Sequence, residues 1–341
     1  MTTTTTESDT HMLKGLHARA LLTVSLLASV PGWAQAAEPK AAAGAQITFH
    51  ADEAYPESFA WSPRQKVFFV GSIHKGTLGT VSLTGTYKPF ASDSAMVAST
   101  GIKYDAKRNL VWAALCDIGV ATQSSPRTQG KQAAVIAFDA STGKKKHAID
   151  LTGVGSDGAH CANDLAFDPA GNVYVTDSNT PVVYVIDRHF KPRELVRNEA
   201  FTGEGFNLNG IVYHPDGYLL VGKHNTGDLF RITLGPKVEV RAVQLSAKIP
   251  GADGIERVDR NTLVIAQNAG QDRAIRVTST DGWQSAEVVE VARSVASFPV
   301  AVTTVGNDLY MLVNRVDTLI DPSAKKVSDY LVQRLPSKSG D

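Results

Sequence analysis

Four side chains with oxygen donors stand at the start of similar apolar segments: Glu57, Asn163, Asn209 and Asp253. Carboxylate and amide oxygens are the ligands that Ca²⁺ prefers, whereas Zn²⁺ favours the nitrogen and sulfur atoms of His and Cys. The two acids would balance the charge of a divalent ion, and Mg²⁺ or Mn²⁺ would fit the same donors. Taken singly, each residue also suits a strand cap or an Asx-turn. A calcium site therefore requires that the fold bring the four together.

The four segments belong to a repeat that runs through most of the chain. Each lead residue is followed by an alternating apolar run, a turn such as DPAG or HPDG, and a second apolar run that starts ten residues after the lead. Thr100 and Pro299 lead two further copies, which gives six units. The units are roughly 45 residues apart, a period typical of propeller blades. One interval is longer because the polar segment 117–132 is inserted as a loop.

Period-2 alternation and tight turns predict about four short strands in each unit. The predicted fold class is therefore all-β: a six-bladed β-propeller with four-stranded blades around a central channel. We expect a single propeller domain at residues 55–335, preceded by a lead-in strand or linker at 37–54. The constant spacing argues against two domains, because it would have to continue across any boundary between them.

The fold would place the lead residues together. In a propeller the first strand of each blade runs along the channel, so equivalent residues form a ring at one mouth. The predicted ring contains Glu57, Thr100, Asn163, Asn209, Asp253 and Pro299. Four oxygen donors that converge in this way favour a metal site over separate strand caps. The second strands should return to the same mouth fifteen residues after each lead. Those positions are Ser72, Leu115, Ser178, His224, Asn268 and Asn314, five of which are polar. We expect the polar residues among them to form a pocket rim, with Thr100 of the ring as a further member.

Several stretches resemble a known family. "YPESFAWSP", "ANDLAFDPAGNVYVTDS", "LNGIVYHPDGYLLVG" and "ADGIERVDRNTLVIAQN" look like segments of the senescence marker protein (regucalcin)/gluconolactonase family of six-bladed propellers. The resemblance covers about residues 55–315 and implies a divalent ion, commonly calcium, held by Glu57, Asn163, Asn209 and Asp253. Diisopropyl fluorophosphatase and the paraoxonases are similar in using such an ion, which widens the implied substrates from sugar lactones to other esters.

One position departs from the pattern of that family. Members that act on sugar lactones often carry a substrate-binding Arg two residues before the Asn of the third blade, and this chain has Cys161 there. The departure argues against aldonolactones as substrates.

Two functional hypotheses follow. In the first, the protein is a metal-dependent hydrolase of lactones or related esters, in which the ion polarises the carbonyl group. Asp253 is then the preferred general base, and His224 and His160 are weaker candidates for proton transfer. In the second, the protein is a non-catalytic propeller that the metal stabilises and that binds a small molecule or a protein partner. We expect a monomer in either case.

Other classes of function are disfavoured. The chain of 341 residues has 34 basic and 34 acidic side chains, so no net field attracts nucleic acid. It shows no nucleotide-binding glycine motif between a strand and a helix, and no G-x-S-x-G elbow of a serine hydrolase.

The first 36 residues are typical of a leader rather than of the fold. A polar low-complexity run precedes Met12, which competes with Met1 as the true start. Lys14 and Arg19, an apolar stretch and an Ala-x-Ala site ending at Ala36 follow, as in secretory signal peptides. We expect an exported protein, periplasmic or secreted, with no membrane association after cleavage.

Export would place the chain where disulfides form. The chain has two cysteines, Cys116 and Cys161, each beside a predicted strand. The sequence leaves open whether they form a bridge or remain two inert buried thiols.

Overall fold

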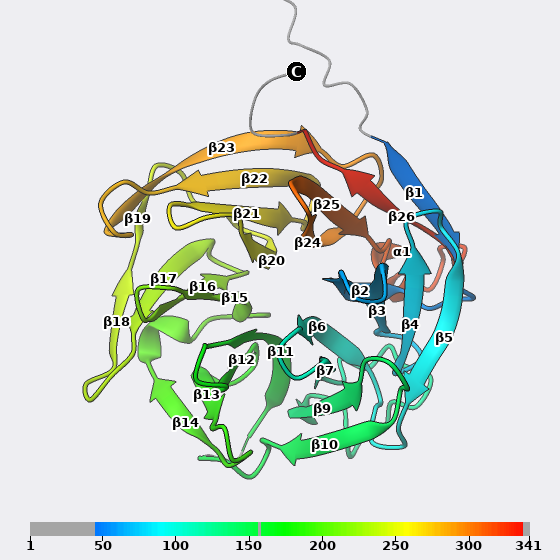
Figure 1. Cartoon of the computed structure of the whole chain (residues 1–341), viewed down its shortest axis with the longest axis horizontal. Coiled ribbons are helices and arrows are strands. Elements are labelled where there is room, and N and C mark those ends of the chain that lie inside the picture. The colour runs from blue at the N-terminus through cyan, green and yellow to red at the C-terminus, as the bar shows by residue number, and fades with distance from the viewer. Residues whose placement is uncertain (1–44, 156–157, 337–341) are drawn as a thin grey trace, which may run out of the picture. The chain divides into compact units, whose positions relative to one another are not determined.

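The structure, a computed structural model, describes residues 45–155 and 158–336. The described residues form six sheets that follow one another in a ring around a central channel (Figure 1). The prediction of an all-β, six-bladed propeller is confirmed. The predicted leader at 1–36 lies outside the described residues. Within the described ranges, no helix is long and apolar enough to cross a membrane.

Each of the first three blades is a sheet built outward from the channel. Blade 1 consists of β2 (Pro56–Ser62), β3 (Val67–Ser72), β4 (Thr77–Ser82) and β5 (Tyr87–Ser92). Blade 2 consists of β6 (Ser99–Asp105), β7 (Leu110–Leu115), β9 (Ala134–Asp139) and β10 (Lys145–Asp150). Blade 3 consists of β11 (His160–Phe167), β12 (Val173–Asp177), β13 (Val182–Ile186) and β14 (Pro192–Arg197), with the short β8 (Lys131–Gln132) parallel to β11.

The remaining blades repeat this plan. Blade 4 consists of β15 (Leu208–His214), β16 (Tyr218–Lys223), β17 (Asp228–Thr233) and β18 (Glu239–Ala242). Blade 5 consists of β20 (Ala252–Arg257), β21 (Thr262–Gln267), β22 (Arg273–Thr278) and β23 (Ser285–Arg293), extended by β19 (Gln244–Leu245). Blade 6 consists of β24 (Pro299–Val305), β25 (Asp308–Val313), β26 (Asp329–Arg334) and β1 (Gln46–His50). The described helices are the 3₁₀ turn η1 (Glu199–Phe201) and α1 (Asp317–Ile320).

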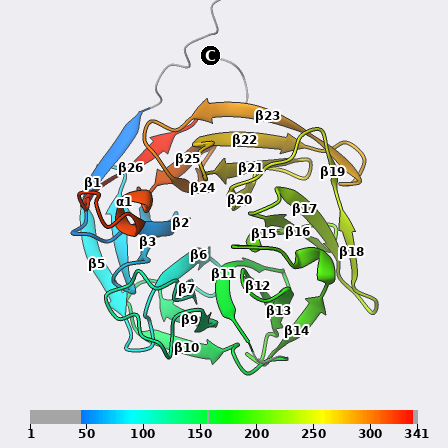
Figure 2. The ribbon, with the colours of Figure 1, turned by 180° about the vertical axis from the view of Figure 1, so that it is seen from behind.

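Blade 6 closes the ring with strands from both ends of the chain. β1 pairs antiparallel with β26, in a register that sets Gln46 opposite Gln333. Figures 1 and 2 show β1 beside β26 at the outer edge of this blade. The closing sheet thus includes part of the 37–54 segment, which the sequence only suggested as a lead-in strand.

The hydrophobic core lies between neighbouring blades. Between blades 2 and 3, for example, Trp112 of β7 and Tyr184 of β13 belong to one buried cluster, and neither is exposed. Alternation explains this arrangement, because every second side chain of a strand faces the same neighbouring blade. Full burial of one such large apolar side chain contributes about 1.5–3 kcal/mol.

The inner strands share a local distortion at the channel mouth. In all six, the antiparallel register shifts next to the ring position, so the ring residues stand in bulges rather than in regular pairs. Neighbouring blades also approach closely there. A Cβ atom on Gly210 would lie 2.3 Å from the main-chain oxygen of Asp253, which explains the glycine after Asn209.

The register of the sixth blade differs from the expected one. Its inner hairpin turns through two residues only, because Val305 pairs with Asp308, whereas Ser62 of blade 1 pairs with Val67. The ten-residue spacing therefore does not hold in blade 6. Val300, not Pro299, occupies the ring position.

Candidate metal and active site

One mouth of the channel opens into a cavity of about 100 Å³, called here the first cavity. The predicted ring residues of five blades line it together with Val300 of the sixth: Glu57, Thr100, Asn163, Asn209 and Asp253. The side chains of Asn163, Asn209 and Asp253 are almost completely buried. The four predicted metal ligands thus reach the same cavity from four different blades.

The two acids of the ring occupy an unfavourable environment for negative charge. Desolvation raises the pKa of Glu57 well above its usual range, and the nearby charges of Asp253 and Asp164 raise it further. Desolvation likewise raises the pKa of Asp253, with a further contribution from Asp164. The positive charge of Lys103 offsets only part of the effect on Glu57. The cavity therefore favours a bound cation or a proton.

Lys103, which is partly exposed, and the buried Asp164 form an ion pair in the channel. Lys103 Nζ lies 3.3 Å from Asp164 Oδ2, and the aspartate side chain is 6% exposed. The main-chain NH of Ile211 also donates to this carboxylate. Asp164 follows Asn163 directly, so the Asn-Asp pair of the sequence places one side chain in the first cavity and a second carboxylate beneath it.

The donor set fits a hard divalent cation. Glu57 and Asp253 supply carboxylates, and Asn163 and Asn209 supply amide oxygens, with no nitrogen or sulfur ligand among them. Within the described ranges, no group of three or more His, Cys, Asp or Glu side chains is placed to hold a metal ion. An ion at this mouth would therefore depend on the two amides as well as on the two acids.

His224, Asn268 and Asp253 form a hydrogen-bonded chain at the cavity. His224 Nε2 donates to Asn268 Oδ1 at 2.8 Å, and Asn268 Nδ2 donates to Asp253 Oδ2 at 2.5 Å. All three residues line the cavity. Burial lowers the pKa of His224, so the neutral ring predominates at neutral pH and its Nδ1 is the proton acceptor. The amide thus orients both groups that were predicted to transfer protons here.

Asn314 brings an unsatisfied donor to the same cavity. Its Oδ1 accepts a hydrogen bond from the main-chain NH of Val316 at 2.9 Å. The residue is completely buried, and no described group accepts a hydrogen bond from its Nδ2. A buried NH without an acceptor is costly, and a ligand oxygen in the cavity would satisfy it.

The other predicted site residues have structural roles. Thr100 lines the cavity, but its hydroxyl donates to the main-chain oxygens of Ala114 and Ala162. Ser178 does not line it, because its Oγ donates to the main-chain oxygen of Leu208 in the next blade. A constant fifteen-residue spacing does not specify which way a side chain points where bulges shift the register.

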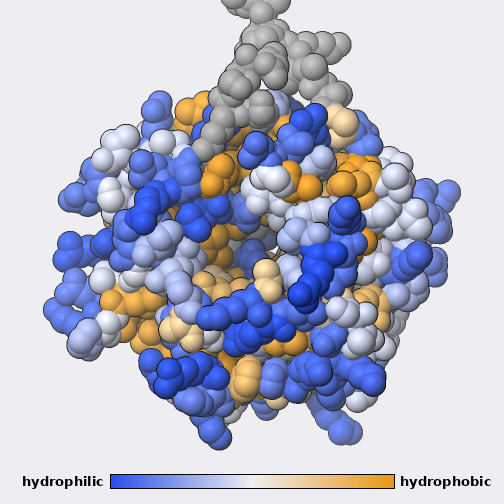
Figure 3. Space-filling view, viewed as in Figure 1, coloured by the Kyte–Doolittle hydropathy of each residue, from blue (hydrophilic) through white to orange (hydrophobic). Residues whose placement is uncertain are grey.

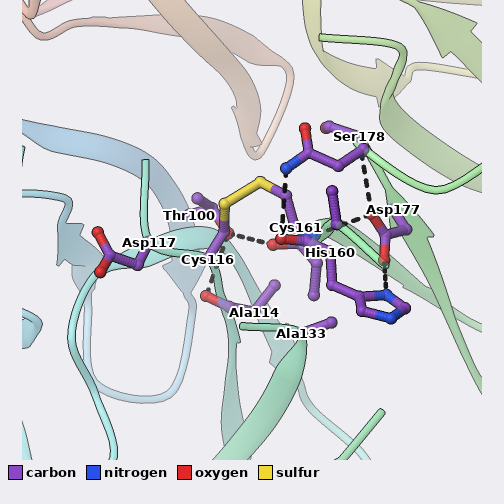
Figure 4. Close-up of a disulfide and its surroundings, with 12 residues drawn as sticks. Thr100, Ala114, Cys116, Asp117, Ala133, His160, Cys161, Asp177 and Ser178 are labelled. Atoms are coloured by element: carbon purple, nitrogen blue, oxygen red, sulfur yellow. Dashed lines mark hydrogen bonds and ion pairs between the residues drawn. A yellow bond between two sulfur atoms is a disulfide. The ribbon is translucent and has the colours of Figure 1, made fainter. Parts of the chain in front are cut away.

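His160 also lies away from the first cavity. It is 1% exposed, and its Nδ1 is 3.1 Å from Asp177 Oδ2 (Figure 4). The hydroxyl of Tyr184 lies 3.3 Å from the same nitrogen. The imidazole is directed between strands of blade 3 rather than toward the channel. The structure therefore does not place this proposed proton-transfer residue at the site.

The sequence did not indicate that half of the cavity is apolar. Its polar ring faces an apolar wall, defined as Ile73, Ile118, Phe206, Phe298, Val300, Val316 and Ile320. Five large apolar residues are exposed among those described, and two of them, Phe206 and Ile320, belong to this wall. Phe206 stands three residues before Asn209, and Phe298 stands two residues before Val300. This closeness to ring positions is the one feature of the sequence that could have indicated an apolar wall.

The inserted loop supplies part of this wall. Its polar residues bind the buried carboxylate of Asp117, which accepts hydrogen bonds from the hydroxyls of Ser124 and Thr128. Ile118 follows Asp117 and lines the cavity. The loop is thus organised around one carboxylate and contributes to the site.

Cys116 and Cys161 form a disulfide that joins blades 2 and 3 at this mouth (Figure 4). Their Cα atoms are 4.5 Å apart, and both side chains are completely buried. Cys161 lines the first cavity. It stands at the position where sugar-lactone members of the family named in the sequence analysis often carry a substrate-binding Arg. The sequence left open whether the two cysteines are bridged or are inert buried thiols, and the structure shows that they are bridged.

We expect replacement of both cysteines by serine to lower the free energy of unfolding by about 2–4 kcal/mol, because the bridge closes a loop of 45 residues in the unfolded chain. Denaturant titration of the double variant and of the oxidised wild type measures this difference. Reduction of the wild type should have the same effect and leave the variant unchanged. Equal stability of the oxidised and reduced wild type would contradict the prediction.

The fold and this site define a six-bladed β-propeller with a polar, acidic ring at one channel mouth. No protein-family model and no curated protein matches the sequence. Solved structures do match. The allergen Mala s 1 of Malassezia sympodialis superposes with a TM-score of 0.68 at 17% identity, over 85% of this chain and 96% of that chain.

Two enzymes are also similar in structure. The gluconolactonase XC5397 of Xanthomonas campestris has a TM-score of 0.56 at 14% identity, over 85% of this chain and 89% of its own. An inactive virginiamycin B lyase of Staphylococcus aureus has a TM-score of 0.59 at 13% identity, over 86% of this chain and 99% of its own. A lactonase and a lyase share this fold, so the likeness confirms the fold and the choice of reaction must come from the site.

Proposed function

We propose that the protein is an exported, divalent-metal-dependent hydrolase of lactones or related esters that carry an apolar substituent. The observation that supports this function best is the composition of the first cavity. Buried carboxylates, an orphan amide donor and an oriented histidine stand opposite an apolar wall, an arrangement that suits the hydrolysis of an apolar ester. A polyhydroxylated sugar lactone would leave that wall without a partner.

Glu57, Asn163, Asn209 and Asp253 would hold the ion, and Ca²⁺ fits the set best. When bound, such an ion polarises a carbonyl oxygen and offsets developing negative charge. It would also neutralise two carboxylates whose raised pKa values reflect their burial.

The residues of this chain supply the remaining steps. The water oxygen forms a bond to the carbonyl carbon, and Asp253 or Nδ1 of His224 accepts the proton that the water loses. Asn314 Nδ2 donates to the carbonyl oxygen as this atom becomes negative. The bond from the carbonyl carbon to the leaving oxygen then breaks, and that oxygen takes the proton back. The products are a carboxylic acid and an alcohol, joined in one molecule when the substrate is a lactone.

Metal analysis of the purified protein, followed by a panel of lactones and aryl esters with and without chelator, tests this function. We expect long-chain lactones to be hydrolysed faster than gluconolactone, and we expect chelation to abolish turnover and added Ca²⁺ to restore it. Undiminished turnover by metal-stripped, folded protein would overturn the proposal. Export receives support from the disulfide, since such bridges persist in oxidising compartments. Determination of the N-terminus of the protein recovered outside the cytoplasm tests it.

Replacement of Asn314 by Leu should lower kcat by about 10²-fold with a smaller effect on KM, because the lost donor acts mainly on the developing oxyanion. Steady-state kinetics of this variant measure the effect. Asn172 lies far from the first cavity in the turn of blade 3 and provides a control, as Asn172→Leu. A rise in KM with unchanged kcat would assign Asn314 to substrate binding instead.

The pH profile tests His224. Because burial lowers its pKa below the usual 6.5, the neutral acceptor form persists at neutral pH and is lost only under acidic conditions. We expect an acidic limb of kcat/KM below pH 6.5 that changes shape in His224→Gln, because the contribution of His224 is lost and that of the acidic residues Glu57 and Asp253 remains. An unchanged limb in the variant would exclude His224 as the proton acceptor.

A further inference from the structure

The channel has a second cavity at its opposite mouth, larger than the first. Its volume is about 680 Å³, within the range of small-molecule sites. α1 borders the first cavity and lies toward the viewer in Figure 2, so Figure 3, drawn from the other side, shows the second mouth. The face in Figure 3 is hollowed at the centre of the ring, with hydrophobic and hydrophilic residues around the opening.

The repeat that forms the first cavity also forms the second. The residues four positions after each ring residue all line it: Trp61, Tyr104, Phe167, Tyr213, Arg257 and Thr304. Four consecutive blades thus contribute an aromatic side chain each. Trp61 packs against Phe68 with ring centroids 5.0 Å apart, and all four rings remain partly exposed. Such a ring offers flat apolar surfaces to a planar ligand.

Arg257 supplies a fixed cation at this second mouth that is available to a ligand. Its Nε donates to the main-chain oxygen of Tyr213 at 3.1 Å, which holds the guanidinium in place. Among the described residues, no hydrogen bond or ion pair engages its two terminal nitrogens. Two other cations of the lining form ion pairs, Arg108 with Asp105 and Lys103 with Asp164. The third, Lys107, is exposed, and its Nζ contacts the main-chain oxygen of Pro169 at 3.4 Å. An immobilised guanidinium fork matches the geometry of a carboxylate.

Lys103 separates the two cavities. It lines the second cavity, and its charge acts on Glu57 at the first mouth as well as on Glu256 at the second. Thr304 Oγ1 donates to Glu256 at 2.8 Å, which holds this acid at the floor. The two cavities have no lining residue in common, so the second is a separate site and not an extension of the first.

We propose that the second cavity binds a small aromatic carboxylate, with the ring among the aromatic side chains of blades 1–4 and the carboxylate on the terminal nitrogens of Arg257. The proposal does not depend on hydrolysis or on a metal at the first mouth. It requires a ligand with both a planar apolar part and an anionic group.

Calorimetric titration with 2-naphthoate tests the proposal, with 2-naphthol and acetate as probes that lack the charge or the ring. We expect saturable binding of 2-naphthoate only, and a Kd raised at least about tenfold by Arg257→Met, since the fork carries the charge-assisted contact. Arg257→Lys should bind weakly because it keeps the charge without the fork. Arg241→Met is the matched control, because Arg241 is exposed and pairs with Glu239 on β18.

Tryptophan fluorescence gives an independent readout. Trp61 is partly exposed at the second cavity, whereas Trp112 and Trp283 are buried. Quenching by 2-naphthoate should saturate at the calorimetric Kd and disappear in Trp61→Phe. Undiminished binding by folded Arg257→Met and Arg257→Lys, or equal binding of 2-naphthol, would overturn the proposal. Loss of binding in Asn314→Leu, at the first cavity, would place the probe at the wrong mouth and would also overturn it.

Discussion

Replacement of Asp253 by Asn is expected to lower kcat/KM by about 10³-fold or more, while the metal-free protein keeps or gains stability, because burial disfavours the charge of Asp253 as it does that of Glu57. A general base contributes about 10²–10⁴-fold, and the same side chain is also a proposed ligand. The fold should tolerate the change because Asn has the same shape and its oxygen can still accept the hydrogen bond from Asn268. Kinetics and thermal unfolding of the chelated proteins measure the two quantities separately.

The same variant distinguishes catalysis from a purely structural role of the metal. If the ion only stabilises the channel, Asp253→Asn should weaken Ca²⁺ binding and lower the calcium-dependent stability, with no activity to lose. Asp228→Asn is the matched control, because Asp228 is at the start of β17 and pairs with Lys248 at the surface. Near-wild-type turnover by Asp253→Asn would exclude Asp253 as the base.

Replacement of Glu57 by Gln is expected to have opposite effects with and without metal. In chelated protein at pH 7, the variant should be more stable than the wild type by about 1–3 kcal/mol, because it removes a charge that burial and two neighbouring carboxylates disfavour. In Ca²⁺ at about 100 times Kd, the wild type should gain about 2.7 kcal/mol and the variant much less. Denaturant titrations with and without Ca²⁺ measure both differences.

The pH dependence of this effect has a defined sign. A carboxyl whose folded pKa is raised loses stability as pH rises from its unfolded value, about 4.5, through its folded value. The gain from Glu57→Gln in chelated protein should therefore vanish near pH 4 and grow toward pH 8. Glu239→Gln, on the exposed strand β18, is the control. A gain that persists unchanged at pH 4 would contradict the electrostatic explanation.

Much of the fold was predictable because the repeat is local. Each hairpin carries its own alternation and turn residues, so six copies specify six sheets without knowledge of their contacts. Blade 6 is the one blade in which the constant spacing fails. Its two-residue turn, Gly306-Asn307, shortens the hairpin and moves the ring position from Pro299 to Val300. A Gly-Asn pair is typical of such turns, and the assumed ten-residue spacing concealed this signal.

The site was predictable only where it follows the repeat. Glu57, Asn163, Asn209 and Asp253 share one register, and the channel brings them together. The apolar wall comes from connections of different lengths, whose paths depend on tertiary contacts such as the hydrogen bonds around Asp117. His160 was proposed for the site because it is close to Asn163 in sequence, but its ring contacts Asp177 instead. Residues three apart in a strand point to opposite sides.

The pairing of β1 with β26 also constrains the order in which the molecule can form. His50 and Asp329 bond across 279 residues, so the ring cannot close until the last strand of the chain is present. Contacts this distant in sequence form late, because a long loop must close before they can form. A chain that emerges N-terminus first therefore keeps an open sheet edge until β26 is available for pairing. The closure of blade 6 is therefore the step before which an incomplete chain is exposed to proteases and to aggregation.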